Sequence, residues 1–445
     1  MKIVARQALL PEGWAEHVEI TLDGGHITGI APAAPGAVAD HDTLLPGVAN
    51  LHSHAFQRGF AGLTEARGPG ADSFWTWRDM MYRFALGLDP DAAQAVAEMA
   101  YVEMLEAGYT RVGEFHYLHH APDGRPYADP AEMSARIFAA SAATGIALTH
   151  LPVFYAHGGF GPTAASDGQR RFLHDREAFL RLIELCDRMA ADRPGAVVGL
   201  APHSLRAASA DDLAALIPAL PGRPVHIHIA EQTPEVRDCL AFCGQRPVEW
   251  LLEHAPVGPG WCLIHATHLT EAEVAGIARS GAVVGLCPVT ESNLGDGIFP
   301  GPAFAAAGGR YGVGTDSNVR ISLAGELRTL EYSQRLAGQA RNVMALREGS
   351  TGQQLFDAAL AGGHQALDAG VPGLAPGAPA DLVALCDPLQ MGSDGPTMLD
   401  RWIFGPDITV GDVWARGDHV VRDGRHRDRA AVTRRFARVA RAILG

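Results

Sequence analysis

The chain has 445 residues, too many for one small core, and its length predicts two or three domains or one large barrel with additions. Hydrophobic residues make up 47% of the chain and charged residues 19%, as in ordinary soluble globular proteins. The formal net charge of −14 argues against nucleic-acid binding, which requires a basic surface.

No segment of the chain reads as a membrane anchor or a leader. Residues 1–18 lack a long apolar core followed by a small-residue cleavage site, and no run of about eighteen apolar residues is present. The cysteines are scattered, and no two pairs are spaced to complete a thiolate metal site. They are Cys186, Cys239, Cys243, Cys262, Cys287 and Cys386. We therefore expect reduced thiols in a cytoplasmic protein that has no membrane partner.

The first 45 residues predict short strands. The segments 2–10, 17–30 and 41–46 are rich in apolar and β-branched residues, and Asp23-Gly24-Gly25 supplies a hairpin turn within the second. We assign residues 1–45 to the N-terminal part of a β domain.

After these strands the sequence pattern changes, and short apolar runs alternate with longer Ala-rich helical segments such as 91–108 and 176–192. The eight runs are 47–54, 110–117, 146–154, 196–204, 224–231, 261–267, 282–288 and 311–317. Eight strands that alternate with helices imply a parallel sheet closed into a (β/α)8 TIM barrel. We assign residues 46–370 to this barrel.

The C-terminal region returns to short strands with glycine turns, in "PGAPADLVALCD" and "TVGDVWARGDHVVRDGRHR". We assign residues 371–445 to the C-terminal part of the β domain plus a terminal helix. The two chain ends are expected to pair into one small composite β-sandwich beside the barrel, so the predicted fold class is α/β.

Most of the eight apolar runs end in polar residues. His52 and His54 close the first run, and because residues i and i+2 of a strand point to the same side, both imidazoles can share one partner. The other polar ends are His116 and Tyr117, His203, Glu231, His265 and Asp316. The C-terminal strand ends of such barrels carry the chemistry. The pattern therefore predicts an active site at this end.

The fifth run offers two histidines of the same parity, His226 and His228. His228 lies nearer the C-terminal end, so we predict it as a ligand and His226 as a packed histidine. With Asp316, the predicted set is His52, His54, His228 and Asp316, which leaves an open position for water, as in catalytic zinc sites. Zinc is favoured by the imidazoles, and iron or manganese remains an alternative. Lys2 is the only lysine, so no interior lysine can bridge two metals, and we expect one ion per chain.

The motifs "PGVANLHSH", "HIAE", "LIHATH" and "GTDS" resemble the amidohydrolase superfamily over almost the whole chain. More narrowly, "NLHSHAFQR", "FWTWRDMMY", "EFHYLHH", "PHSLRA" and "HIAEQ" resemble the formimidoylglutamate deiminases of histidine degradation. The resemblance implies a mononuclear zinc enzyme that converts N-formimino-L-glutamate and water to N-formyl-L-glutamate and ammonia. It is also compatible with a homodimer.

Residue by residue, the resemblance places His52, His54, His228 and Asp316 on the family's metal ligands and Glu231 and His265 on its catalytic pair. It places Gln57, Arg78, Tyr117, His203 and Arg206 on substrate-pocket positions. Chemically, Asp316 can take the proton of water, Glu231 can protonate the leaving nitrogen, and His265 can orient the nucleophile. The roles of Ser317 and Asn318 stay open, and His116, His119 and His120 are either pocket lining or polar loop residues.

Two other functions compete with this interpretation. Another deaminase or chlorohydrolase of the superfamily, acting on a heterocycle, would keep the metal ligands but would need an apolar or stacking pocket. Arg78 and Arg206 favour an anionic, dicarboxylate substrate instead. A non-catalytic scaffold on the same fold should have lost ligands, and here all of them are present.

Overall fold

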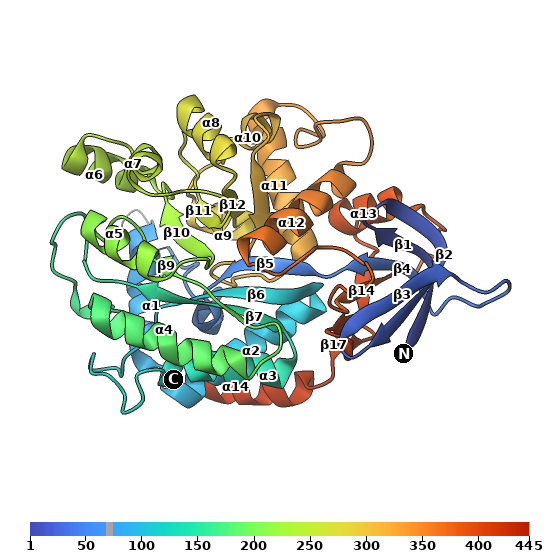
Figure 1. Cartoon of the computed structure of the whole chain (residues 1–445), viewed down its shortest axis with the longest axis horizontal. Coiled ribbons are helices and arrows are strands. Elements are labelled where there is room, and N and C mark those ends of the chain that lie inside the picture. Colours follow the sequence, from blue (N-terminus) through green and yellow to red (C-terminus); the bar gives the residue numbers. More distant parts are fainter. Residues whose placement is uncertain (68–73, 445) are drawn as a thin grey trace.

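The computed structural model describes residues 1–67 and 74–444 and shows a barrel of parallel strands beside a smaller β domain (Figure 1). In Figure 1 the β domain contains both the blue N-terminal strands and the red C-terminal strands, on one side of the barrel. Residues 68–73 and residue 445 lie outside the described part of the chain. The predicted fold class is confirmed.

The barrel consists of two parallel sheets, ordered β5-β6-β7-β8 and β10-β11-β12-β13, and β9 pairs with β7. Single bridges between Leu200 and Val225 and between Ser53 and Asp316 join the two sheets at both seams. The strands are β5 (Val48–Ser53), β6 (Tyr109–His116), β7 (Ala147–Phe154), β8 (Val197–Val198), β9 (Ala201–Pro202), β10 (Val225–Ile229), β11 (Trp261–His265), β12 (Val283–Leu286) and β13 (Arg310–Val313).

Every residue of β5, β6 and β7 is buried, because helices cover the outer face of the barrel while side chains fill its interior. The helices of the barrel region are α1 (Phe74–Gly87), α2 (Pro90–Glu106), α3 (Glu132–Thr144), α4 (Arg176–Ala191), α5 (Ala210–Ala219), α6 (Thr233–Cys243), α7 (Pro247–His254), α8 (Glu271–Ser280), α9 (Pro288–Leu294), α10 (Gly301–Ala306), α11 (Leu323–Gly338) and α12 (Thr351–Ala366). Helix α4 shows the expected pattern: Phe179, Leu182, Ile183 and Cys186 form its buried face, and the Asp175 side chain caps its N-terminus.

Both chain ends build the β domain, whose eight strands are hydrogen-bonded in one continuous sheet of order β17-β16-β15-β14-β4-β1-β2-β3. The strands are β1 (Lys2–Leu10), β2 (Gly13–Asp23), β3 (His26–Pro32), β4 (His41–Pro46), β14 (Leu382–Cys386), β15 (Thr409–Ala415), β16 (Asp418–Arg422) and β17 (Arg425–His426). Antiparallel pairing of β4 with β14 joins the two ends of the chain. Helix α13 (Gly395–Phe404) lies between β14 and β15 in sequence, and α14 (Arg429–Leu444) packs on α2.

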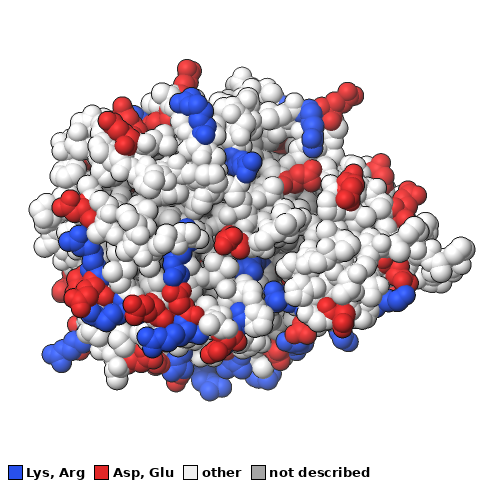
Figure 2. Space-filling view, viewed as in Figure 1, with Lys and Arg blue, Asp and Glu red and all other residues white. Residues whose placement is uncertain are grey.

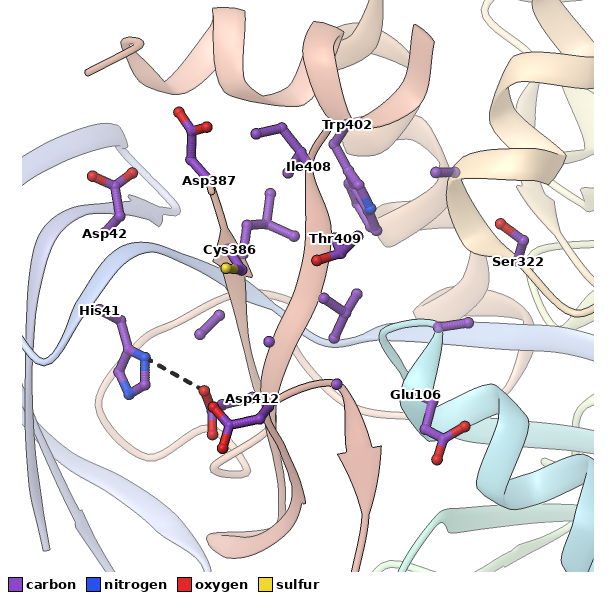
Figure 3. Close-up of a pocket in the computed structure, with 18 of the residues that line it drawn as sticks. His41, Asp42, Glu106, Ser322, Cys386, Asp387, Trp402, Ile408, Thr409 and Asp412 are labelled. Atoms are coloured by element: carbon purple, nitrogen blue, oxygen red, sulfur yellow. Dashed lines mark ion pairs between the residues drawn. The ribbon is translucent and has the colours of Figure 1, made fainter. Parts of the chain in front are cut away.

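A cavity of about 1590 Å³ lies at the junction of the β domain and the barrel (Figure 3). Its walls include His41, Glu106, Trp402 and Asp412, and His41 Nδ1 lies 3.8 Å from Asp412 Oδ2. None of the four predicted metal ligands lines this cavity. The large hollow is therefore separate from the strand ends where the chemistry is expected.

On the face shown in Figure 2, basic and acidic side chains are interspersed rather than sorted into one basic field. The absence of a nucleic-acid partner stays a prediction. Among the described residues, no helix combines the length and the apolar character needed to cross a membrane.

Candidate metal centre and active site

The predicted metal ligands lie together at the C-terminal ends of the strands. His52 lies on β5, His54 directly follows it, His228 lies on β10, and Asp316 lies three residues beyond β13. Each is at most 5% exposed, and one ligand atom from each lies within 4.8 Å of the others. Asp316 Oδ1 lies 3.4 Å from His52 Nε2 and 3.3 Å from His54 Nε2, and the Nε2 atoms of His52 and His228 are 3.1 Å apart.

Main-chain carbonyls fix the tautomers of two of these histidines. Nδ1 of His54 donates to the Phe115 carbonyl at 2.9 Å, and Nδ1 of His228 donates to the His203 carbonyl at 3.1 Å. A carbonyl can only accept, so each Nδ1 carries the proton and each Nε2 presents a lone pair. Two imidazole lone pairs and a carboxylate therefore face one another. This donor set fits a metal ion.

The strand ends that carry the ligands are tied to each other by the backbone and by Asn318. The His54 amide donates to the Asp316 carbonyl and the Asp316 amide donates to the His52 carbonyl, both at 2.9 Å. Asn318 Nδ2 donates to Ser53 Oγ and to the carbonyls of His54 and Asp316. The Ser317 hydroxyl instead lies 2.9 Å from Thr290 Oγ1. The two residues whose roles were open thus hold the loop after β13.

His226 lies on the same strand as His228 but faces another neighbour. Its Nε2 donates to the Ala366 carbonyl at 2.8 Å, and the side chain is fully buried. Burial lowers the pKa of His226 to about 4. The structure therefore places His228, and not His226, in the cluster.

His265 lies among three carboxylates. Its Nδ1 lies 3.2 Å from Glu291 Oε1, and its Nε2 lies 3.8 Å from both Glu231 Oε1 and Asp316 Oδ2. Burial alone would lower the pKa of His265, but the charge of Glu231 and the hydrogen bond to Glu291 outweigh it and raise the pKa to about 10. Burial raises the pKa of Glu231 to about 7, which suits proton transfer near neutral pH. Glu291 is a contact that the sequence did not reveal.

A narrow cavity of about 60 Å³ opens over the cluster in the described part of the chain. All five predicted substrate residues line it: Gln57, Arg78, Tyr117, His203 and Arg206. Gln57 Nε2 donates to Tyr117 Oη at 2.8 Å, which ties two of them together. The wall also contains residues that were not predicted, namely Trp77, Met81, Tyr82, Tyr155, Phe172 and Leu294.

His116, His119 and His120 do not line this cavity. They belong to a separate group of imidazoles with His150 and His174, in which neighbouring ring centroids lie 4.5 to 6.4 Å apart. Nε2 of His119 donates to the Val153 carbonyl and Nε2 of His120 donates to the Leu173 carbonyl.

Residues 43–418 match the model of the amidohydrolase family. The chain belongs to this family. Residues 1–42 match the model described as formimidoylglutamate deiminase HutF, N-terminal domain. The predicted hydrolase and the predicted resemblance to formimidoylglutamate deiminases are confirmed.

Individual relatives agree with the family assignment. The chain is 50% identical over 454 residues to a formimidoylglutamate deiminase of Pseudomonas aeruginosa, with 99% of both chains covered. It superimposes with a TM-score of 0.98 on a crystal structure of an amidohydrolase from Brucella melitensis, at 54% identity and full coverage of both chains. An adenosine deaminase from Xanthomonas campestris with bound zinc shares the fold at 23% identity and a TM-score of 0.80, over 100% of this chain and 98% of that one.

Proposed function

We propose that this chain hydrolyses N-formimino-L-glutamate to N-formyl-L-glutamate and ammonia, as a step of histidine degradation. The observation that carries the proposal is one cavity that joins the metal-ligand cluster, the Glu231–His265 pair and two arginines, Arg78 and Arg206. The similarity to a formimidoylglutamate deiminase over 99% of the chain supports the same substrate.

The metal proposed for the cluster is zinc, one ion per chain, held by His52, His54, His228 and Asp316. When bound, zinc supplies the Lewis-acid chemistry that makes water acidic enough to attack at neutral pH. Iron or manganese remains an alternative, because imidazole and carboxylate donors also suit these ions. A second group of potential ligands in the described residues, His265 with Cys287 and Asp316, shares Asp316 with the first group. No interior lysine is available to bridge two ions.

Three side chains of this cavity carry the reaction: Asp316 and Glu231 move protons, and His265 orients the attacking oxygen. Asp316 accepts a proton from the attacking water, whose oxygen forms a bond to the formimino carbon. His265, held by Glu291, orients that oxygen and stabilises its developing negative charge. Glu231 gives a proton to the former imino nitrogen, the carbon–nitrogen bond breaks and ammonia leaves. The oxygen returns its remaining proton to Glu231 as the carbon becomes a formyl group, and the proton held by Asp316 leaves with ammonia as ammonium.

The remaining wall of the cavity suits a small dicarboxylate with a protonated formimino group. Arg78 and Arg206 can bind carboxylates through two hydrogen bonds each. Gln57 Oε1 is buried and has no hydrogen-bond partner among the described residues, so it can accept an N–H of the formimino group. His203 and Tyr117 complete the proposed contacts. A cavity with two arginines is less suited to a neutral heterocycle, the leading alternative substrate class.

An ammonia-release assay on a panel of substrates tests this proposal. The enzyme, stripped of metal and reloaded with zinc, should release ammonia from N-formimino-L-glutamate and not from adenosine or an aminated triazine. The metal-stripped sample is the control and should be inactive. Faster turnover of a heterocycle than of N-formimino-L-glutamate would support the alternative deaminase and overturn the proposal.

Three further assignments extend the proposal. We place the protein in the cytoplasm, because the six cysteines are free, including Cys239 and Cys243, whose sulfur atoms are 3.8 Å apart. We propose a homodimer and domain boundaries near residues 45 and 370. Size measurement in solution tests the dimer, and limited proteolysis tests the boundaries.

A further inference from the structure

Tyr155 is a cavity residue that none of the motifs identified. It directly follows β7, and the His174 amide donates to its carbonyl at 2.9 Å, which fixes the backbone. Its phenol lines the same cavity as Arg78 and Arg206 and is 8% exposed. A buried phenol on the wall of a substrate cavity needs partners for its hydroxyl group.

The orientation of the Gln169 amide determines how that hydroxyl is bonded. Gln169 Oε1 accepts from the Ser166 main-chain N–H at 2.7 Å and from Ser166 Oγ at 3.0 Å. A main-chain N–H can only donate, so the oxygen of the amide must face Ser166 and the nitrogen must face away. Gln169 Nε2 therefore donates to Tyr155 Oη, at 2.6 Å.

The turn that carries Gln169 packs against α1, which contributes Tyr82 to the same cavity wall. Ser166 and Gln169 form a reciprocal capping box around the 3-10 turn η2 (Asp167–Gln169). Gly168 packs closely against Tyr82, since a Cβ at this position would lie 2.5 Å from Tyr82 Cδ2. The turn thus contacts two tyrosines of the cavity, Tyr82 through Gly168 and Tyr155 through Gln169.

Because its oxygen accepts from Gln169, the Tyr155 hydroxyl must send its own proton elsewhere. In the described part of the chain no group accepts this proton. Arg206 and Arg78 line the same cavity as the phenol, and burial raises the pKa of Tyr155 while their positive charges lower it. An O–H donor beside two guanidinium groups is suited to an anion that all three can bind.

We infer that Tyr155 is a specificity-determining residue whose hydroxyl donates to a carboxylate of the substrate, and that Gln169 is a positioning residue that fixes the direction of this donation. This inference rests on the proposed function. Tyr155 would add a neutral hydrogen-bond donor to the two arginines of the cavity. The capping box of Ser166 and Gln169 would hold the Gln169 amide in the orientation that this donation requires.

The first test is Tyr155→Phe, which removes only the hydroxyl. We expect kcat/KM on N-formimino-L-glutamate to fall roughly 10- to 100-fold, the size expected when a carboxylate loses a hydrogen bond. The loss should lie mainly in KM, because the carboxylates are remote from the reacting carbon. Zinc content should stay unchanged. Tyr109→Phe, at the opposite end of the barrel, is the matched control and should have wild-type kinetics.

Two analogues locate the carboxylate. N-formimino-L-norvaline has a methyl in place of the side-chain carboxylate, and N-formimino-4-aminobutyrate lacks the α-carboxylate. On the analogue that lacks the carboxylate bound by Tyr155, Tyr155→Phe should no longer lower kcat/KM. Equal penalties on both analogues and on the parent substrate would indicate a general structural defect and would overturn the inference.

Gln169 is tested by a double-mutant cycle. Gln169→Leu leaves the phenol free to rotate, so we expect a KM increase smaller than that of Tyr155→Phe. Because Gln169 acts through Tyr155, the double variant should be no worse than Tyr155→Phe alone. Fully additive losses would show that Gln169 does not act through Tyr155 and would overturn the positioning role.

The outcome separates this inference from the proposed function. If the wild-type enzyme releases no ammonia from N-formimino-L-glutamate, the proposed function is wrong and the inference fails with it. If the wild type is active and Tyr155→Phe stays within about twofold of it, well below the expected loss, only the role of Tyr155 is wrong.

Discussion

Replacement of Arg206 by methionine tests how the cavity attracts an anionic substrate. Arg206 follows β9 on the same loop as His203, and its side chain is only partly exposed. The negative charges of Glu235 and Glu231 stabilise the Arg206 cation and raise the pKa of Arg206, although burial acts in the opposite direction. Without Arg206, these carboxylates and a dianionic substrate would face one another with less positive charge between them.

The size of the effect follows from the charges involved. Loss of one partner of a buried charged pair costs about 3–5 kcal/mol, and each 1.36 kcal/mol is about tenfold in rate. Because Arg206 keeps some contact with solvent, we expect the lower part of this range. Arg206→Met should therefore lower kcat/KM on N-formimino-L-glutamate by roughly 10²–10³-fold. Arg78→Met should cause a loss of the same order.

The assay is ammonia release measured with N-formimino-L-glutamate and with the analogues that lack one carboxylate. Zinc content should be unchanged in the variant, and the penalty should shrink sharply with the analogue that lacks the carboxylate bound by Arg206. Arg206→Lys should fall in between, because lysine keeps the charge and loses the planar fork. Arg223→Met is the matched control: Arg223 pairs with Asp187 away from the cavity and should affect stability rather than kcat/KM.

An equal loss on all substrates would refute the reasoning, since it would point to a folding or loop defect. Wild-type kinetics in Arg206→Met would refute it as well.

Three other predictions address the metal, the proton transfer and the response to pH. His228→Ala should lose zinc and activity together, whereas His226→Ala should keep zinc, as metal analysis will show. Glu231→Gln should keep zinc but lower kcat by at least roughly 10²-fold, because a positioned proton donor contributes about that much or more. Burial lowers the pKa of His116 and of His174 to about 3, against about 6.5 in the unfolded chain. Both imidazoles stay neutral in the folded protein, whereas in the unfolded chain they take up a proton below about pH 6.5. The free energy of unfolding should therefore be highest above about pH 6.5 and fall toward about pH 3. The expected decrease is about 1–2 kcal/mol per histidine between about pH 7.5 and pH 5.

Each of these has a contradicting outcome. Zinc loss in His226→Ala and not in His228→Ala would show that the other histidine is the ligand. If Glu231→Gln turns over within a few-fold of wild type, Glu231 is not the proton donor. The free energy of unfolding, measured with urea, should depend less on pH in His174→Gln, because up to about one proton fewer is taken up on unfolding. An unchanged pH dependence would mean that His174 does not titrate on unfolding.

The sequence predicted the barrel because each strand is a continuous apolar run, as parallel strands buried on both faces require. It also predicted which histidines meet: the parity of His52 and His54 and the position of His228 near a strand end follow from strand geometry alone. These residues are brought together by topology, which the order of strands and helices defines.

The supporting residues could not be found in this way. Glu291 lies in α9 within "TESN" and reads as a solvated helix residue, yet it is bonded to His265, 26 residues earlier. Tyr155 reads as the end of a buried strand, and its partner Gln169 lies 14 residues later in a short 3-10 turn. Such contacts depend on how loops fold over the strand ends, which hydrophobic periodicity does not encode.

The products formed by the zinc-loaded enzyme test the central claim most directly. Attack of water makes the formimino carbon tetrahedral while both of its nitrogens are still bonded to it. The role of Glu231 predicts that the imino nitrogen is the one that leaves. Carbon-13 NMR of the reaction should therefore show N-formyl-L-glutamate, with ammonia released in equal amount. Formamide and free L-glutamate would mean that the other carbon–nitrogen bond is broken, and would contradict the account.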